Sequence, residues 1–251
     1  MHTETTAIDI PTADGLADAV LITPVEGGPH PGVLLYMDAF GLRPRLEEMA
    51  GRLAGQGYAV LVPNVFYRSG RAPVVELGDL SRPEIRSAAF EKLGPVMQQL
   101  TPDRAMHDAD AYLAFLGAYE RVTHGPVGTV GYCMGGALAL RTAAHAPDRV
   151  AAAASFHGGR LATDRPDSVH LLAGRITAEV YIGHADNDGS MPPEQQERLA
   201  QALSEAGARH RTELYAGAAH GFTMADTAAY DEAATERHWD RLTDLLARTL
   251  R

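Results

Sequence analysis

The segment Val127–Gly136, with the sequence VGTVGYCMGG, decides how the rest of the chain is interpreted. A short apolar run ends in the pattern Gly-x-Cys-x-Gly and continues into ALALRTAAHA, a sequence that favours helix. A strand, a sharp turn and a helix in this order form a nucleophile elbow, here with cysteine where serine is usual. Gly131 and Gly135 stand where the tight turn leaves no room for a side chain. Cys133 is therefore the candidate nucleophile, and a buried cysteine in a glycine-rich turn is the alternative.

Strands and helices are predicted to alternate along nearly the whole chain. Continuous apolar runs, typical of strands buried on both faces of a parallel sheet, occupy residues 32–37, 58–62, 127–130 and 150–156, and further strands are predicted over 179–183 and 212–215. Apolar spacing, capping residues and composition predict helices over 44–57, 102–121, 137–146, 193–206 and 226–250. Residues 5–23 are expected to form two short edge strands joined at 13–15. The pattern predicts a mostly parallel, doubly wound α/β sheet with helices on both faces and an N-terminal hairpin.

Length and composition describe one domain of ordinary globular character. With 251 residues, 45% of them apolar and 22% charged, the chain suits a single α/β domain over residues 1–251, because no linker-like stretch divides it. Residues 64–100 break the alternation with four arginines and several glycines and prolines. We expect an irregular insertion there, either a cap over the site or a meandering surface segment.

Charge, cysteine count and hydropathy narrow the range of partners. The net charge of -10 argues against a nucleic-acid-binding surface. A single cysteine excludes an internal disulfide and a four-cysteine metal site, and it suits a reducing compartment. The N-terminus lacks the basic and apolar regions of a signal peptide, and no apolar run reaches the roughly 18 residues of a transmembrane helix. We therefore expect a cytoplasmic monomer or homodimer that binds a small molecule, with no nucleic-acid or membrane partner.

Reactive side chains follow the predicted strands, where the functional groups of open α/β sheets gather: Asp38, Cys133, the pair Asp186 and Asp188, and His220. The order nucleophile, acid, histidine is the chain order of an α/β-hydrolase triad. His220, beside glycine after the last strand, is the expected base. The four-residue step to a following proline favours Asp188 as the acid. Asp186 is the alternative acid, and otherwise it would brace the loop.

These residue types predict nucleophilic catalysis. A thiol with an ordinary pKa of about 8.5 needs a base, and His220, oriented by the aspartate, can take its proton and pass it to a leaving group. The N–H groups of Met134, at a helix N-terminus, and of Ala39 are expected to stabilise the oxyanion. Attack gives an acyl-thioenzyme that water hydrolyses.

The remaining histidines carry weaker signals. His157, in Phe-His-Gly-Gly, is expected to line the pocket or to have a structural role, and His184 and His170 are weaker candidates for the site. No zinc-binding pattern such as H-E-x-x-H occurs, so a zinc site is not expected.

Four segments together resemble the dienelactone hydrolases (carboxymethylenebutenolidases): residues 37–41, 57–68, 131–136 and 220–222. The resemblance extends from about residue 30 to the C-terminal helix. It implies the α/β-hydrolase fold and a Cys-His-Asp hydrolase that acts on a lactone or related ester without a metal or organic cofactor. It also implies substrate contacts from Phe40, Tyr132 and Arg68, with Arg68 binding a substrate carboxylate.

Two departures from the family pattern bear on the substrate. The family glutamate that contacts the resting thiol is replaced by Asp38, whose side chain is one methylene shorter. We expect Asp38 to gate the thiol, that is, to keep it protonated until substrate arrives, with a shorter reach than the glutamate. The second carboxylate-binding arginine of the family falls at Met224, which is expected to contact the substrate in its place. Losing a charge-assisted contact costs about 1.5–3 kcal/mol, so we expect a preference for a less anionic ester or lactone than dienelactone.

Two other functions remain open on the sequence. A non-catalytic binding protein could use the same fold, although a complete Cys, Asp and His set in hydrolase order speaks against it. A thiol redox protein is the other alternative, but the chain has no second cysteine to form an internal disulfide. Transfer of the acyl group to an acceptor other than water stays open within the hydrolase reading.

Overall fold

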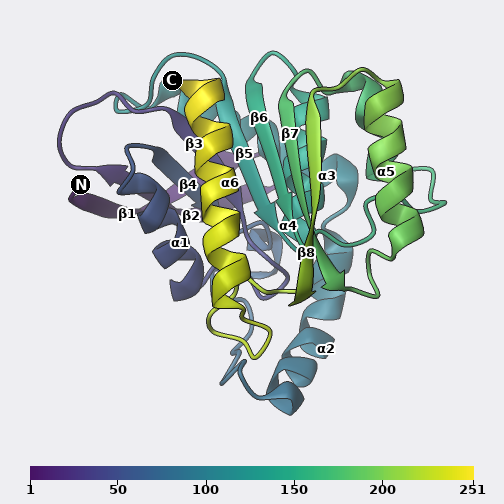
Figure 1. Cartoon of the computed structure of the whole chain (residues 1–251). Helices are drawn as coiled ribbons and strands as arrows, with labels where there is room; N and C mark the ends of the chain where they lie inside the picture. Colours follow the sequence, from purple (N-terminus) through teal and green to yellow (C-terminus); the bar gives the residue numbers. More distant parts are fainter. The chain divides into compact units, whose positions relative to one another are not determined.

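The computed structural model describes all 251 residues, and its contacts divide the chain into two compact units, Met1–Val127 and Gly128–Arg251. Each unit combines strands with helices, as Figure 1 shows. None of the helices is both long enough and apolar enough to cross a lipid bilayer.

Four strands form the sheet portion of the first unit. They are β1 (Thr3–Thr12), β2 (Gly15–Pro24), β3 (Gly32–Tyr36) and β4 (Ala59–Pro63), in the order β1-β2-β4-β3. β1 and β2 form the predicted antiparallel hairpin, β2 pairs antiparallel with β4, and β3 pairs parallel with β4. Every residue of β3 and β4 is buried, as their apolar runs predict. The expectation of two short edge strands is wrong for β2, because this ten-residue strand pairs on both sides.

Three α-helices and one short 3₁₀ segment, η1 (Tyr67–Ser69), complete the first unit. α1 (Pro44–Ala54) packs its apolar stripe, which includes Leu46, Met49 and Leu53, against β2 and β4. α3 (Pro102–Ala118) is capped by Thr101, whose hydroxyl accepts the Arg104 N–H at 3.3 Å. α2 (Pro83–Gln99) adds regular structure to a segment that the sequence predicts to be irregular. Because α2 buries only two residues, its apolar periodicity is weak and the sequence pattern does not reveal it.

The second unit contains β5 (Val127–Tyr132), β6 (Val150–Phe156), β7 (Glu179–Asn187) and β8 (His210–Ala219), in that order. β6 pairs parallel with β7, and β7 pairs parallel with β8. Its helices are α4 (Met134–His145), α5 (Pro193–Glu205) and α6 (Glu232–Leu250), with a 3₁₀ segment η2 (Val169–Arg175). α6 begins at Glu232 rather than 226, because Asp231 caps it by accepting the Ala234 N–H at 2.9 Å. The predicted mostly parallel α/β architecture is confirmed.

Helices α4 and α6 cover opposite faces of β5 and β6 (Figure 1). Thr129 of β5 donates its hydroxyl to the Ala139 carbonyl of α4 at 3.1 Å. Tyr132, three residues on, hydrogen-bonds His238 of α6 at 2.9 Å, and Phe156 of β6 packs its ring on the same histidine. Since side chains alternate along a strand, residues three apart point to opposite faces.

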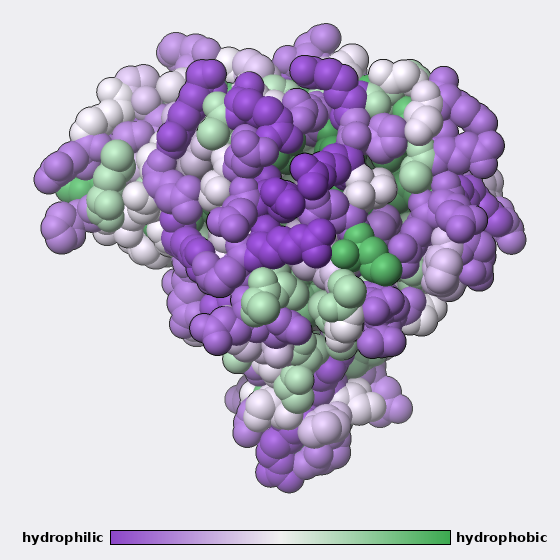
Figure 2. All heavy atoms as spheres, in the orientation of Figure 1, coloured by the Kyte–Doolittle hydropathy of each residue, from purple (hydrophilic) through white to green (hydrophobic).

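The outer face of α6 is exposed to solvent. Figure 2 shows a largely hydrophilic surface over this helix, and its exposed residues include six charged ones: Glu232, Glu236, Arg237, Asp240, Asp244 and Arg248. Its buried residues, among them Trp239, Leu242 and Leu246, recur at helical spacing. The helix is therefore held by one apolar stripe against the sheet, not by a second partner on its outer side.

His184 is a buried polar residue of β7 whose two ring nitrogens have no hydrogen-bond partner within the protein. Burial lowers its pKa from 6.5 to about 4, against a weaker opposing effect of the Asp188 charge. The folded protein therefore keeps this ring neutral at pH values where the unfolded chain already binds a proton. The stabilisation is complete above the unfolded pKa of 6.5 and is lost as the pH falls from there towards 4.

We expect the free energy of unfolding to fall between pH 7 and pH 4, with up to about 3 kcal/mol of the decline due to His184. Urea unfolding of His184→Leu across this range should show a shallower decline than the wild type. The matched control is His124→Leu, at an exposed histidine, and it should retain the wild-type slope. Equal slopes for all three proteins would contradict the assignment to His184.

Candidate active site

The elbow at the end of β5 reverses the chain at a single residue. Cys133 has φ 55° and ψ −120°, a conformation that side chains rarely adopt, and α4 starts at the next residue. A Cβ on Gly131 would lie 1.8 Å from the Gly135 carbonyl oxygen, so only glycine fits there. The Cys133 N–H donates to the Phe156 carbonyl at 3.1 Å and to His157 Nδ1 at 3.2 Å. The loop after β6 therefore holds the backbone of the candidate nucleophile.

Three sequence-predicted site residues of the second unit lie in one hydrogen-bonded chain. His220 Nε2 is 3.0 Å from Cys133 Sγ, and His220 Nδ1 is 2.6 Å from Asp188 Oδ2. They come from the carboxyl ends of β5, β7 and β8, which parallel pairing brings to the same edge of the sheet. The imidazole of His220 thus contacts a thiol with one nitrogen and a carboxylate with the other.

The two candidate acids have different partners. Asp188 is 8% exposed and accepts the Ser190 N–H at 2.8 Å and the Ser190 hydroxyl at 2.6 Å besides its contact with His220. Asp186 is exposed and accepts the Gly217 N–H of β8 at 2.8 Å. Ser190 was not identified from the sequence, although a serine two residues after an aspartate is a familiar turn pattern.

Electrostatics distinguish the two histidines beside Cys133. Burial alone would lower the pKa of His220, but hydrogen bonds with Asp188 and Cys133 outweigh burial and raise it to about 10. Burial alone would raise the pKa of Asp188, yet its bonds to His220 and Ser190 lower it. Burial, followed by the positive charge of His220, lowers the pKa of His157 well below its usual range. The two neighbouring rings are thus shifted in opposite directions: the surroundings of His220 favour its protonated form, and those of His157 favour its neutral form.

The backbone also provides a donor at this edge. Met134 is the first residue of α4, and the first N–H groups of a helix have no acceptor inside it. Such a group can stabilise negative charge on an oxygen beside the elbow. The second predicted donor, Ala39, belongs to the first unit, where it is buried and lies between Asp38 and Phe40.

Asp38 forms a buried ion pair inside the first unit. Arg43 donates to both of its carboxylate oxygens, at 2.6 and 3.0 Å, and the Phe40 N–H donates to one of them at 2.9 Å. The two side chains are only 4% and 5% exposed, and the guanidinium lies 5.7 Å from the centre of the Phe40 ring. The sequence alone did not identify Arg43 as the partner of Asp38. The ion pair with Arg43 competes with the predicted contact between Asp38 and the thiol, since breaking a buried ion pair is costly.

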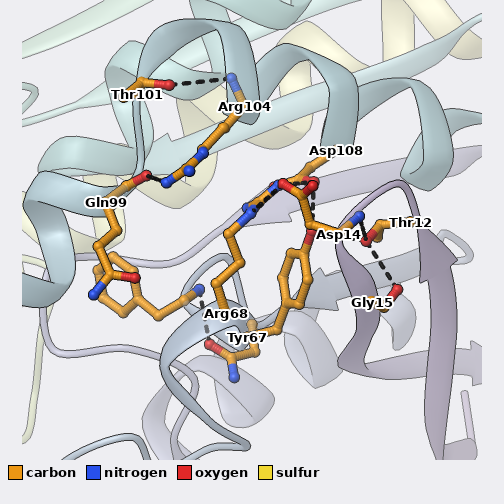
Figure 3. A network of polar contacts seen from close by, with 11 residues as sticks. Thr12, Asp14, Gly15, Tyr67, Arg68, Gln99, Thr101, Arg104 and Asp108 are labelled. Carbon is orange, nitrogen blue, oxygen red and sulfur yellow. Dashed lines mark hydrogen bonds and ion pairs between the residues drawn. The ribbon is translucent and has the colours of Figure 1, made fainter.

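Arg68 is the centre of a polar network in the first unit (Figure 3). Its guanidinium donates to Asp14 at 2.7 Å and, through two nitrogens, to Asp108 at 2.7 and 2.8 Å. Tyr67 donates its hydroxyl to the same Asp108 carboxylate and lies under the guanidinium. All three nitrogens of Arg68 thus bind carboxylates of the protein itself. Its contact with a substrate carboxylate stays a prediction, and Asp108 is a partner that the sequence did not reveal.

Of the other predicted substrate contacts, Phe40 is partly exposed, whereas the remaining three are buried side chains. Tyr132 is fully buried against α6, and Met224 is 1% exposed. His157 is also 1% exposed and contacts Thr223 at 2.8 Å. Their contact with substrate remains a prediction that this burial does not support. The structure has no group of three or more His, Cys, Asp or Glu side chains arranged to hold a metal ion.

A parallel sheet with helices on both faces, a thiol on the strand–helix elbow, and an aspartate and a histidine after later strands describe an α/β hydrolase. The sequence profile of the dienelactone hydrolase family matches residues 17–250. The chain belongs to the dienelactone hydrolase family and is a carboxylic ester hydrolase.

Relatives of known name agree with this membership. A Synechocystis protein provisionally named a carboxymethylenebutenolidase is 27% identical over 251 residues, 99% of this chain and 98% of the relative. The carboxymethylenebutenolidase of Rhodococcus opacus is 27% identical over 221 residues, 87% of this chain and 81% of the relative. The crystal structure of a provisionally named dienelactone hydrolase from Klebsiella pneumoniae has the same fold, with a TM-score of 0.83 over 98% of this chain and 99% of that chain at 22% identity.

The elbow predicts one sharply position-dependent substitution. Gly131→Ala should lower the free energy of unfolding by on the order of 4 kcal/mol or prevent folding, because the new methyl meets backbone that cannot move aside. Gly51→Ala, in the middle of α1 with open space at its Cβ, should be neutral or stabilising by up to about 1 kcal/mol. Chemical unfolding of both variants measures the difference, and a Gly131→Ala protein of wild-type stability would contradict the elbow geometry.

Proposed function

We propose that this protein hydrolyses a small, neutral or weakly anionic ester or lactone, with Cys133 as nucleophile, His220 as base and acid, and Asp188 as the orienting carboxylate. The observation that carries the proposal is the continuous hydrogen-bonded chain from Cys133 Sγ through His220 to Asp188. Family membership supports ester hydrolysis as the reaction class.

In the first step, the thiol proton resides on His220 and the sulfur attacks the ester carbonyl carbon. The raised pKa of His220 favours transfer of the proton from the thiol to the imidazole, because the resulting imidazolium is stabilised by Asp188 and faces the sulfur. The carbonyl oxygen becomes an oxyanion that the Met134 N–H stabilises, with the Ala39 N–H as the second donor predicted from the sequence.

Collapse of the tetrahedral intermediate breaks the bond to the alcohol oxygen. The imidazolium of His220 gives its proton to that oxygen, and the acyl group remains on Cys133 as a thioester. Neutral His220 then takes a proton from water, whose oxygen attacks the thioester carbon. The second collapse releases a carboxylic acid, and the proton on His220 and the thiolate restore the starting state.

The triad assignment predicts unequal effects at the two aspartates. Cys133→Ser and His220→Ala should lower kcat for p-nitrophenyl acetate by about 1000-fold or more. Asp188→Asn should lower it by about 100-fold to 10,000-fold, because the amide stabilises neither the tautomer nor the imidazolium. Asp186→Asn is the matched control, two residues earlier in the loop, and should stay within about threefold of wild type. The opposite ranking of the two aspartates would exchange their roles.

Iodoacetamide labelling separates the proposed hydrolase from the two other functions considered. Cys133 should be alkylated in the native protein, and His220→Ala should slow the alkylation. An unreactive Cys133 and no turnover of esters would favour a binding protein. Reversible oxidation by peroxide without any esterase activity would favour a redox protein.

The substrate class follows from the charges that are already paired. Arg68 is bound to Asp14 and Asp108, and Arg43 is bound to Asp38. Where the family pattern has its second arginine, this chain has Met224, whose buried thioether carries no charge. Recruiting either arginine to a substrate carboxylate would strip a protein carboxylate of its partner, and for buried pairs this costs about 3–5 kcal/mol.

We therefore expect neutral acyl groups to be preferred over anionic ones. In kcat/KM, p-nitrophenyl acetate should exceed mono-p-nitrophenyl succinate, which adds a carboxylate to the acyl group, by about tenfold or more. Dienelactone should be turned over more slowly than p-nitrophenyl acetate. Equal or faster turnover of the two anionic compounds would show that a cation is available to them and would overturn this substrate class.

A further inference from the structure

His157 contacts the nucleophile's backbone, although the reaction steps above assign it no role. It follows β6 directly, has φ 40°, and is 1% exposed. A histidine in the left-handed region with a fully buried ring is unfavourable by itself, so the surroundings must hold it there. Its own N–H donates to the Gly183 carbonyl at 2.8 Å and continues the ladder between β6 and β7.

The partners of the ring assign one tautomer. Nδ1 lies 3.2 Å from the Cys133 backbone nitrogen, whose N–H can only donate, so Nδ1 is the acceptor and carries no proton. The proton of the neutral ring is therefore on Nε2, which donates to Thr223 Oγ1 at 2.8 Å. A protonated ring would lose the acceptor that faces Cys133.

Thr223 connects this histidine to the loop that carries the base. It stands three residues after His220, fully buried, in a turn closed by the Met224 N–H donating to the Gly221 carbonyl at 2.9 Å. The His157 ring also packs edge-on against the His220 ring, with centroids 5.3 Å apart. One imidazole thus touches the elbow backbone on one side and the base and its loop on the other.

We propose that His157 is a positioning residue: as a neutral Nε2–H imidazole, it ties the Cys133 backbone to Thr223 and so holds Cys133 Sγ and His220 Nε2 in hydrogen-bonding contact. The inference rests on the proposed hydrolase function. The two hydrogen bonds of the His157 ring, to the Cys133 N–H and to Thr223, thus form a bridge. Removing this bridge should slow the chemical steps, which need the contact between Cys133 and His220, and leave substrate binding nearly unchanged. A displacement of about 1 Å between reacting groups lowers a rate by about 100-fold.

Three variants separate the two halves of the bridge. His157→Phe keeps a flat ring for packing but removes both hydrogen bonds. His157→Asn keeps an acceptor close to the place of Nδ1 and suits a positive φ. Thr223→Val keeps the shape of the side chain and removes the partner of Nε2. Thr142→Val, at a fully buried threonine of α4, is the matched control.

Turnover of p-nitrophenyl acetate gives kcat and KM for each folded variant, with thermal unfolding as the test of folding. We expect kcat to fall about 10-fold to 100-fold in His157→Phe with KM within about twofold, and His157→Asn to recover most of the loss. Thr223→Val should lower kcat about threefold to tenfold, and it should have no further effect when added to His157→Phe. Thr142→Val should have the wild-type kcat.

A folded His157→Phe with the wild-type kcat overturns the inference, and so does a silent Thr223→Val. If His157→Phe does not fold, His157→Asn and Thr223→Val decide the question, since a positioning role requires kcat to fall in the second and to be largely kept in the first. An inactive wild type overturns the proposed hydrolase function together with this inference. An active wild type that loses activity on Cys133→Ser but is indifferent at His157 and Thr223 overturns this inference alone.

Discussion

The reversal of the chain at Cys133 is the constraint on which the active-site edge depends. One residue in an unfavourable backbone conformation takes the chain from β5 into α4, and this is sterically permitted only because Gly131 has no side chain. The same reversal brings the thiol to the tip of the turn and leaves the Met134 N–H at the open start of a helix. The strain is offset by hydrogen bonds from the Cys133 N–H to two acceptors in the loop after β6. The proposed nucleophile, the proposed oxyanion donor and the hydrogen bonds that hold the Cys133 backbone thus all depend on a single turn.

Ion pairing inside each unit explains how the protein accommodates its buried charges. In the second unit, Asp188 is balanced by His220 and further satisfied by Ser190. In the first unit, Asp38 is balanced by Arg43, and Asp108 by Arg68. Each of these carboxylates is nearly inaccessible, where an unpaired charge would be too costly to keep. The difference between the units is that a histidine can gain or lose its proton near neutral pH, whereas an arginine stays charged throughout.

The sequence predicts the parts of this structure that depend on local pattern. Apolar runs located β3, β4 and β6 because a strand buried on both faces needs no other signal. α2 was missed because most of its surface is exposed, so its residues carry little periodicity. β8 is longer than its apolar core, since its register with β7 and not its composition sets where pairing stops. Arg43, Ser190 and Thr223 escaped detection because their importance lies in the atoms they meet, and many other polar residues have the same local appearance.

The ion pairs of Arg68 also have a consequence for how the first unit forms. Arg68 binds Asp14, 54 residues earlier in the chain, and Asp108, 40 residues later. Closing loops of this length costs chain entropy before any contact compensates for it. The three side chains meet only when the β1–β2 hairpin and α3 are both in place, so we expect this cluster to form late in folding. Contacts that form after the rate-limiting step mainly slow unfolding. The network in Figure 3 would then govern how long the first unit stays folded and have little influence on how fast it folds.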